Sequence, residues 1–286
     1  MRYNCIHRRR YQHSIRMMCR LLKVSRSGYY DWNTRAQSAR SVSNQQLTRV
    51  VKQLHLDSNG VYGARKIHRD LLELGELCGR HRVARIMRKV GLKGCPKRRF
   101  RRYANSPPSH PVADNLLEQD FKATRMDERW SSDITYLWTR QGWLFLAVVM
   151  DLFSRRIVGW SMNKLISRHL VIDAMAMALD QRDKPQLHHS DRGSEYTSDD
   201  FRDLLKKHGI ECSMSGRGNC YDNAPVESFF SSLKRERVRR QTYKTRDEAK
   251  ADVFDYIECF YNRKRRHSTL GYISPVEFEN RSLELN

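Results

Sequence analysis

The sequence predicts a basic, all-helical N-terminal arm (residues 1–112) followed by an α/β domain with a mixed sheet. Apolar residues recur at helical spacing through most of the arm, whereas runs of β-forming residues separated by turns begin near residue 129. Charge follows the same division. The arm holds 26 Lys and Arg against 5 Asp and Glu, whereas residues 113–286 hold 28 against 27.

Composition narrows the class of protein. With 286 residues and 39% hydrophobic residues, the chain is long enough for two domains and for a packed core. The longest apolar run is far shorter than a membrane span, and the N-terminus lacks a signal-peptide pattern, so we expect a cytoplasmic protein that does not enter membranes. None of the seven cysteines forms a CxxC pair, which argues against a zinc ribbon or a disulfide framework.

The uneven charge indicates a division of labour. A basic arm favours a polyanion such as DNA, whereas residues 113–233 carry 18 acidic and 15 basic groups. General solubility does not require this asymmetry. The sequence therefore predicts a phosphate-binding module joined to a region that uses carboxylates.

Residues 1–40 contain the outline of a helix-turn-helix. In SIRMMCRLLKVSRSGYYDW (14–32), Ile15, Met18, Cys19 and Leu22 have helical spacing, and Ser25 is placed to cap a second helix. In DNA-binding proteins of this type the second helix enters the major groove. An ordinary helical hairpin has the same pattern, and the residues alone leave both interpretations open.

Residues 41–96 predict a second helical DNA-binding unit. Apolar positions mark three helices, and the third, near 80–90, turns Val83, Ile86 and Met87 inward. Its outer face carries four cations without interspersed acids: Arg82, Arg85, Arg88 and Lys89. A solvent-exposed helix face without a binding role is the alternative. Four neighbouring cations with no acid among them repel one another, however, and this favours contact with a polyanion such as DNA. Residues 97–124, basic and then proline-rich, predict a linker.

The α/β domain is expected over residues 125–235, followed by a basic helical tail over 236–286. Three strands in succession predict an antiparallel part of the sheet, and alternating strands and helices predict the rest. The expected strands are 130–139, 143–153, 156–162, 186–190 and 210–214; the expected helices are 169–179, 199–208 and one beginning near 224.

Three acidic residues stand in distinctive surroundings: Asp133 in WSSDITY, Asp191 in HSDRGSEY and Glu227 in NCYDNAPVESFFSSLK. Asp191 and Glu227 are separated by 35 residues. These motifs, with CRLLKVSRSGYYDW in the arm and YNRKRRHSTLGYISPVEFE in the tail, resemble the OrfB-type transposases of bacterial insertion sequences. The resemblance covers almost the whole chain.

The resemblance implies an RNase H-like fold, shared with retroviral integrases, and a catalytic triad of Asp133, Asp191 and Glu227. It implies that the triad binds two Mg²⁺ ions, for which Mn²⁺ can substitute, because paired metal ions stabilise the attacking and leaving oxygens of phosphodiester transfer. It also implies a DNA phosphate contact for Lys234. This lysine lies seven residues after Glu227, and so on the same face of the expected helix.

Other polar residues near the triad have simpler expected roles. His189 is expected to pack within a strand, and Asp222 and Asn223 to cap the helix that holds Glu227. Asp151 and Glu195 are expected to be structural.

The sequence therefore predicts a transposase that cleaves and joins DNA. A DNA-binding regulator without catalysis is the alternative from another class, and a nuclease that cannot join strands would keep the same triad. The expected partners are the element ends and target DNA, further copies of this chain, and an upstream-frame (OrfA-type) protein or fusion, since the arm has no sustained heptads of its own.

Overall fold

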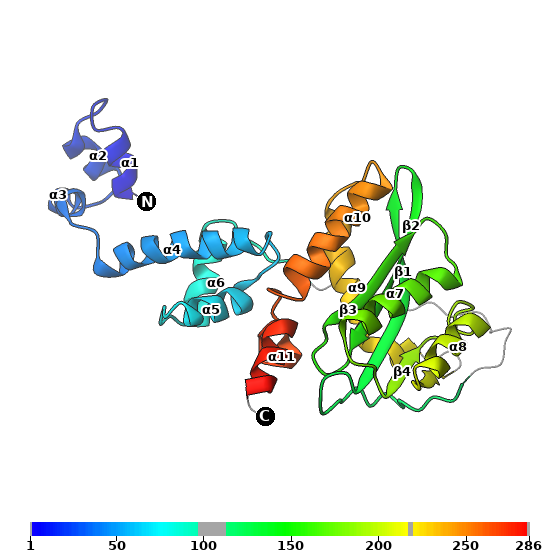
Figure 1. Ribbon diagram of the computed structural model, residues 1–286. Coiled ribbons are helices and arrows are strands. Elements are labelled where there is room, and N and C mark those ends of the chain that lie inside the picture. Colours follow the sequence, from blue (N-terminus) through cyan, green and yellow to red (C-terminus); the bar gives the residue numbers. More distant parts are fainter. Residues whose placement is uncertain (1, 97–112, 217–219, 285–286) are drawn as a thin grey trace.

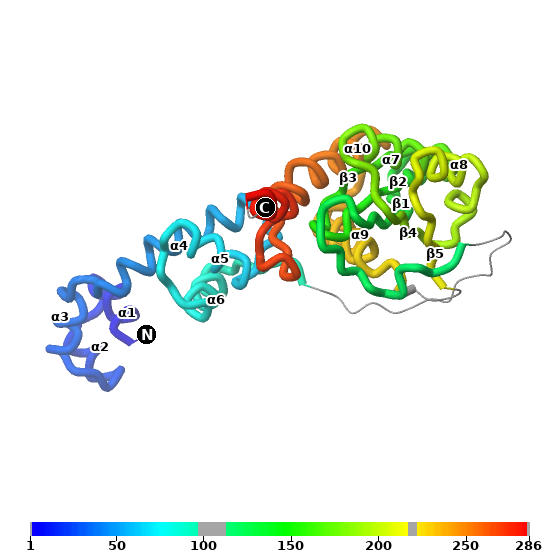
Figure 2. The backbone as a smooth tube through the Cα atoms, turned by 60° about the horizontal axis from the view of Figure 1, so that its bottom comes forward, coloured from blue at the N-terminus to red at the C-terminus, as the bar shows by residue number. Residues whose placement is uncertain are grey.

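The computed structural model describes residues 2–96, 113–216 and 220–284. Figures 1 and 2 show an elongated molecule: three short helices form one end, a second helical unit lies in the middle, and a sheet with its helices forms the other end. The most basic part of the expected linker, Lys97 to Arg102, and its prolines lie outside the described residues.

The N-terminal end is a small three-helix unit of α1 (Arg2–Arg8), α2 (Ile15–Leu21) and α3 (Arg26–Thr34). Its core contains Ile6, Met18, Cys19 and Tyr29. The expected pair of helices is confirmed, including the Ser25 cap, whose hydroxyl accepts from the Gly28 N–H at 3.2 Å. Helix α1 was not predicted, because it contributes a single buried residue, Ile6, and so shows no periodic face.

The middle unit consists of α4 (Ala39–Asp57), α5 (Ala64–Glu73) and α6 (Arg80–Lys89). Val83, Ile86 and Met87 are buried on α6, as their spacing predicts. Across the described part of the chain, no helix combines the length and apolarity needed to cross a bilayer.

The sheet has five strands in the order β3-β2-β1-β4-β5. Strands β1 (Arg129–Thr139), β2 (Gly142–Asp151) and β3 (Ile157–Asn163) are antiparallel, and β4 (Leu187–Ser190) and β5 (Glu211–Met214) run parallel to β1. This mixed sheet, preceded by helices, confirms the predicted fold class. Each expected strand lies within two residues of the observed one at both ends.

Helices cover both faces of the sheet. Helices α7 (Arg168–Gln181) and α8 (Asp199–Lys207) pack on one face, together with Trp130 and Val149. The other face is covered by α9 (Ala224–Glu236), α10 (Arg246–Phe254) and the π-helical segment η3 (Asp255–Tyr261). Short 3-10 turns η1 (Cys220–Asn223), η2 (Val238–Arg240) and η4 (Ser268–Leu270) and the last helix, α11 (Pro275–Glu284), complete the chain.

The middle unit and the sheet domain share one hydrophobic core. Leu47, Val51, Ile67 and Val83 belong to the same buried cluster as Phe229 of α9 and other residues of the sheet domain. Tyr62 joins the two parts by donating its hydroxyl to the Lys264 carbonyl at 2.7 Å. The middle unit is therefore packed against the tail rather than tethered to it loosely.

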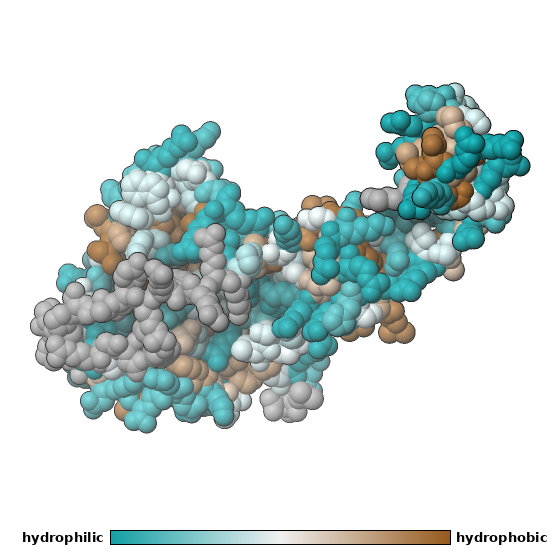
Figure 3. All heavy atoms as spheres, turned by 180° about the vertical axis from the view of Figure 1, so that it is seen from behind, coloured by the Kyte–Doolittle hydropathy of each residue, from teal (hydrophilic) through white to brown (hydrophobic). Residues whose placement is uncertain are grey.

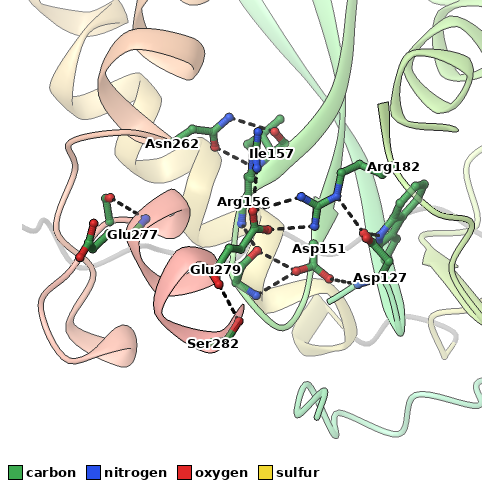
Figure 4. A network of polar contacts seen from close by, with 12 residues as sticks. Asp127, Asp151, Arg156, Ile157, Arg182, Asn262, Glu277, Glu279 and Ser282 are labelled. Atoms are coloured by element: carbon green, nitrogen blue, oxygen red, sulfur yellow. Dashed lines mark hydrogen bonds and ion pairs between the residues drawn. The ribbon is translucent and has the colours of Figure 1, made fainter. Parts of the chain in front are cut away.

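The basic tail uses its arginines internally. Arg266 pairs with Asp70 and Glu73 of α5, and buried Arg265 pairs with Glu236 at the end of α9. Figure 4 shows a further network, in which Glu279 of α11 accepts from Arg156 and Arg182 and so fixes the tail to the sheet domain.

The segment just before β1 also packs on the sheet domain, although composition assigned it to the linker. Leu117 is buried with Leu152 and Leu187, and the Asp114 carbonyl accepts from the Met214 N–H at 3.1 Å. Asp151 is structural, as expected: its carboxylate accepts from the hydroxyl and the N–H of Ser154. Burial raises the pKa of Asp151 to about 6.

Candidate active site

Two neighbouring strands bring Asp133 and Asp191 to the same level of the sheet. Strand β4 runs parallel to β1, with Ser131 opposite His189. Asp133 lies two residues beyond Ser131, and Asp191 lies two residues beyond His189. The two aspartates therefore occupy equivalent places on adjacent strands, although 57 residues separate them in the sequence.

Glu227 is brought to this site by a clasp between β1 and the start of α9. The side-chain amide of Asn223 donates to the Ser132 carbonyl at 2.8 Å and accepts from the Ser131 hydroxyl at 2.6 Å. These bonds hold the first turn of α9 against the strand that carries Asp133. Glu227 is in that first turn.

The expected capping role of Asp222 and Asn223 is wrong. The Asn223 side chain makes no cap hydrogen bond to α9, because both ends of its amide are used by β1. Asp222 instead accepts from the side chains of Asn115 and Gln119 and from the Gly216 N–H. It therefore fastens the loop before α9 to the segment before β1.

The pKa of Asp133 reflects the charges of the other two carboxylates. Desolvation raises the pKa of Asp133 well above its usual range, and repulsion from Asp191 and Glu227 raises it further. Desolvation also raises the pKa of Asp191 and of Glu227, although both side chains are accessible to solvent. The ionised form of each carboxylate is therefore disfavoured unless a positive charge compensates it.

Local hydrogen bonds orient the two aspartates. Asp133 Oδ1 accepts from the Ile134 N–H at 2.7 Å, and Asp191 Oδ1 accepts from the Gly193 N–H at 3.0 Å. Over residues 2–96, 113–216 and 220–284, no three His, Cys, Asp or Glu side chains converge into a ready-made metal site. Asp191 and Glu227 therefore act on Asp133 through their charge without the three side chains meeting at one point.

Two histidines of β4 support the site, and both are buried and neutral near neutral pH. Burial lowers the pKa of His188 to about 3 and that of His189 to about 4, so both rings are neutral. His189 contacts the hydroxyls of Ser213 and Ser215 at 2.9 and 3.2 Å, and His188 contacts that of Ser132 at 2.7 Å. The expected packing role of His189 is confirmed.

Lys234 lies in the last turns of α9, on the side of Asp133. Desolvation lowers the pKa of Lys234, and the charge of Asp133 opposes that shift. Its ammonium lies over the ring of Tyr136, 4.6 Å from the centroid. Tyr136 was not expected at the site; the signal available in the sequence was its position on the Asp133 strand, three residues further along.

The cations expected to bind DNA on α6 differ in their surroundings. Arg85, Arg88 and Lys89 are exposed, whereas Arg82 donates to Asn44 and Ser43 of α4 at 2.8 and 2.7 Å. Figure 1 shows α6 in the middle unit, away from β1 and β4, and Figure 3 shows hydrophilic residues over much of the visible face of the arm. These side chains and the triad therefore form two separate regions.

Comparison with known proteins identifies the family. Residues 123–220 and 227–283 match integrase core domains, and residues 43–100 match an HTH-like domain. The chain is 43% identical to the transposase InsF of insertion sequence IS3A from Escherichia coli strain K12, over 99% of this chain and 100% of that protein. The chain belongs to the IS3 family of transposases. The transposase is also 42% identical to a 31 kDa protein of insertion element IS600 from Shigella sonnei, over 92% of this chain and 98% of that protein.

Solved retroviral integrases are also similar to part of the transposase, at much lower identity. The catalytic core of HTLV-2 integrase, solved with magnesium, is 15% identical with a TM-score of 0.44, and covers 55% of the transposase and 99% of its own chain. The core of BIV integrase is 17% identical with a TM-score of 0.42, over 56% and 97%. The family match favours the predicted transposase over a DNA-binding regulator without catalysis.

Proposed function

We propose that this transposase cleaves and joins DNA strands with Asp133, Asp191 and Glu227 as its catalytic carboxylates. The observation that carries the proposal is the convergence of three elements: Asp133 and Asp191 at equivalent places on β1 and β4, and Glu227 on a helix clasped to β1 by Asn223. The segments that hold them are otherwise distant in the sequence. The repulsion that Asp191 and Glu227 exert on Asp133 is a cost that a purely structural role would not require.

The donor set fits hard divalent cations. Carboxylate oxygens are preferred ligands of Mg²⁺, and positive charge would offset the repulsion that raises the pKa of Asp133. We propose two Mg²⁺ ions, replaceable by Mn²⁺, as the cofactors; when bound, they stabilise the attacking and leaving oxygens of the phosphodiester. The N–H groups of Ile134 and Gly193 keep one oxygen of each aspartate oriented.

The remaining roles divide between two regions. We propose that Lys234 binds a phosphate of the strand held at the carboxylates, since its charge interacts with that of Asp133. Arg85, Arg88 and Lys89 present charge on the arm for the element ends or target DNA. We propose that the active complex contains several copies of this chain on DNA, with an upstream-frame protein as a further partner.

The test replaces each carboxylate by its neutral isostere: Asp133→Asn, Asp191→Asn and Glu227→Gln. Each variant should lose cleavage and joining of labelled DNA in Mg²⁺ and retain DNA affinity, because affinity resides mainly in the arm. Asp199→Asn, which neutralises an exposed acid on α8, is the matched control and should keep wild-type activity. Near wild-type joining by any triad variant would remove that residue from the assignment.

The product of the reaction separates a transposase from a nuclease. A linear DNA with a free 3′-hydroxyl should yield covalently joined strands, since the enzyme retains the end and uses that hydroxyl as the nucleophile. If only hydrolysed ends were recovered under conditions where DNA binding is confirmed, the protein would be a nuclease and not a transposase.

A further inference from the structure

Three large aromatic side chains lie exposed at one end of the sheet. Tyr136 and Trp138 are each 56% exposed and Trp143 is 45% exposed. Trp138 and Trp143 are cross-strand partners with ring centroids 4.7 Å apart, and Tyr136 lies 5.1 Å from Trp143. Together these residues, here called the aromatic platform, form a continuous row of rings.

The platform is exposed because only one face of the β1–β2 hairpin is covered: Leu137 and Leu144 are buried on that face, and the three aromatic rings lie on the other. The hairpin also extends beyond its pairing with β4. β1 spans 11 residues, but β4 pairs only with Arg129, Trp130 and Ser131 at its beginning. Figure 1 shows the hairpin projecting past β4. Burying aromatic rings is favourable, so rings left exposed side by side mark an interaction surface.

The platform lies further along the strand that carries Asp133. Tyr136 and Trp138 follow Asp133 by three and five residues, about 10 and about 17 Å along β1 at roughly 3.3 Å per residue. Because these offsets are odd, the two rings leave the opposite face of β1 from the Asp133 side chain. Lys234 connects the two regions, because its ammonium lies over the Tyr136 ring and also interacts with Asp133.

Cations accompany the rings at the far end as well. Arg246 donates its Nε to the Trp143 carbonyl at 3.0 Å, which places its guanidinium beside the hairpin tip. Arg140 is exposed in the turn between Trp138 and Trp143. Aromatic rings interleaved with cations are the combination that binds single-stranded nucleic acid, in which bases stack on the rings and phosphates meet the charges.

We infer that the aromatic platform stacks unpaired bases of the DNA strand held at the carboxylates. Paired bases within a duplex cover one another's faces, so the rings can stack only on a terminal, overhanging or splayed base. The location of that strand rests on the proposed catalytic function; the stacking itself does not.

The test measures binding of the full-length chain without divalent metal ions, so that no strand is cleaved. The probes are a duplex with a short thymidine overhang and the same duplex with an abasic overhang, which keeps the phosphates and removes the bases. The wild type should bind the thymidine overhang about tenfold more tightly. Trp138→Ala and Trp143→Ala should bind both probes equally, whereas Trp138→Phe should retain part of the preference.

Two controls distinguish stacking from other effects. Phe254→Ala removes an exposed aromatic that packs against Trp160, outside the platform, and should keep the preference. Lys234→Ala should weaken binding of both probes alike, since both carry phosphates.

Equal binding of the two probes by the wild type, or an undiminished preference for the thymidine overhang in both Trp→Ala variants, would overturn the inference. Loss of self-association in those variants with the preference unchanged would assign the surface to a second copy instead. Triad variants that still join DNA would refute the proposed function but leave the stacking result standing.

Discussion

Lys234 interacts both with the Asp133 carboxylate of the site and with the aromatic platform. Its ammonium is partly desolvated, lies over the Tyr136 ring and interacts with Asp133. A cation held in this way is positioned before DNA arrives, which lowers the conformational entropy lost on binding a phosphate.

We therefore expect Lys234→Ala to reduce joining of a pre-cleaved DNA end by roughly tenfold or more, as removal of a charge-assisted hydrogen bond would. Overall DNA affinity should change less, because we expect the basic arm to supply most of it. Lys234→Arg should retain part of the activity, and Lys250→Ala, which removes an exposed lysine of α10, should have no effect. An equal loss of joining in the Lys250 variant would show that joining depends on the total positive charge of the protein and not on the position of Lys234.

Glu236 is the residue whose ionisation contributes most clearly to stability. Although burial opposes it, the hydrogen bonds from Arg265 and Tyr256 and the charge of Arg265 lower the pKa of Glu236 to about 2. A carboxyl group with a lowered pKa stabilises the fold above its unfolded-state pKa of about 4.5, and that contribution disappears as the pH falls toward 2.

Glu236→Gln should therefore lower the free energy of unfolding at pH 7 by about 3 kcal/mol, because it leaves Arg265 buried without its counter-charge. The difference from the wild type should shrink steadily as the pH is lowered from 5 toward 2, as seen by denaturant unfolding. A constant difference over that range would mean that the Glu236 charge contributes nothing.

At the scale of elements, α9 depends on the Asn223 clasp for its position. Asn223 is buried, and its loss would leave the Ser131 hydroxyl and the Ser132 carbonyl without this partner. Unsatisfied buried groups cost about 1–3 kcal/mol each. The clasp also determines where Glu227 lies relative to Asp133.

Asn223→Ala should consequently lower the melting temperature by several degrees and reduce joining more than DNA binding. Joining should remain low when measured at a temperature where circular dichroism shows the variant fully folded. Asn280→Ala on α11, an exposed position, is the control. A folded Asn223 variant with wild-type joining would show that α9 is positioned by its apolar face alone.

At the scale of the whole molecule, the chain divides after the first three helices and not after the arm. The α1–α3 unit has its own small core, whereas α4, α5 and α6 share a core with the sheet domain. Arg266 strengthens that union by pairing with Asp70 and Glu73. Truncation before α4 therefore leaves the shared core intact, whereas truncation before the sheet domain divides that core.

A fragment of residues 39–286 should melt within a few degrees of the full chain and bind DNA with an affinity that falls steeply with salt. A fragment of residues 113–286 should melt well below it or aggregate, because removal of α4–α6 exposes apolar surface. Comparable melting of the two fragments would show that the shared core contributes little to stability.

Much of the fold is readable from local patterns. The strands of the sheet, helices α7 to α9, and the inward face of α6 were predictable because period-two and period-3.6 spacing arise from residues near one another in the chain. The triad was predicted from three motifs and their order, and the structure places Asp133 and Asp191 on adjacent strands as the fold class requires.

Tertiary structure decided what each polar side chain does. Arg266 pairs with residues 193 and 196 positions away, and Asn223 bonds to a strand 91 positions away. No local spacing encodes such partners. The sequence therefore predicted a helix cap for Asn223, a DNA contact for Arg82 and a basic helical tail whose ion pairs could not be foreseen. The aromatic platform likewise follows from packing, which buries Leu137 on one face of β1 and leaves Tyr136 and Trp138 uncovered on the other. Sequence determines which side chains are available along each element, whereas packing determines which of them remain free to bind DNA.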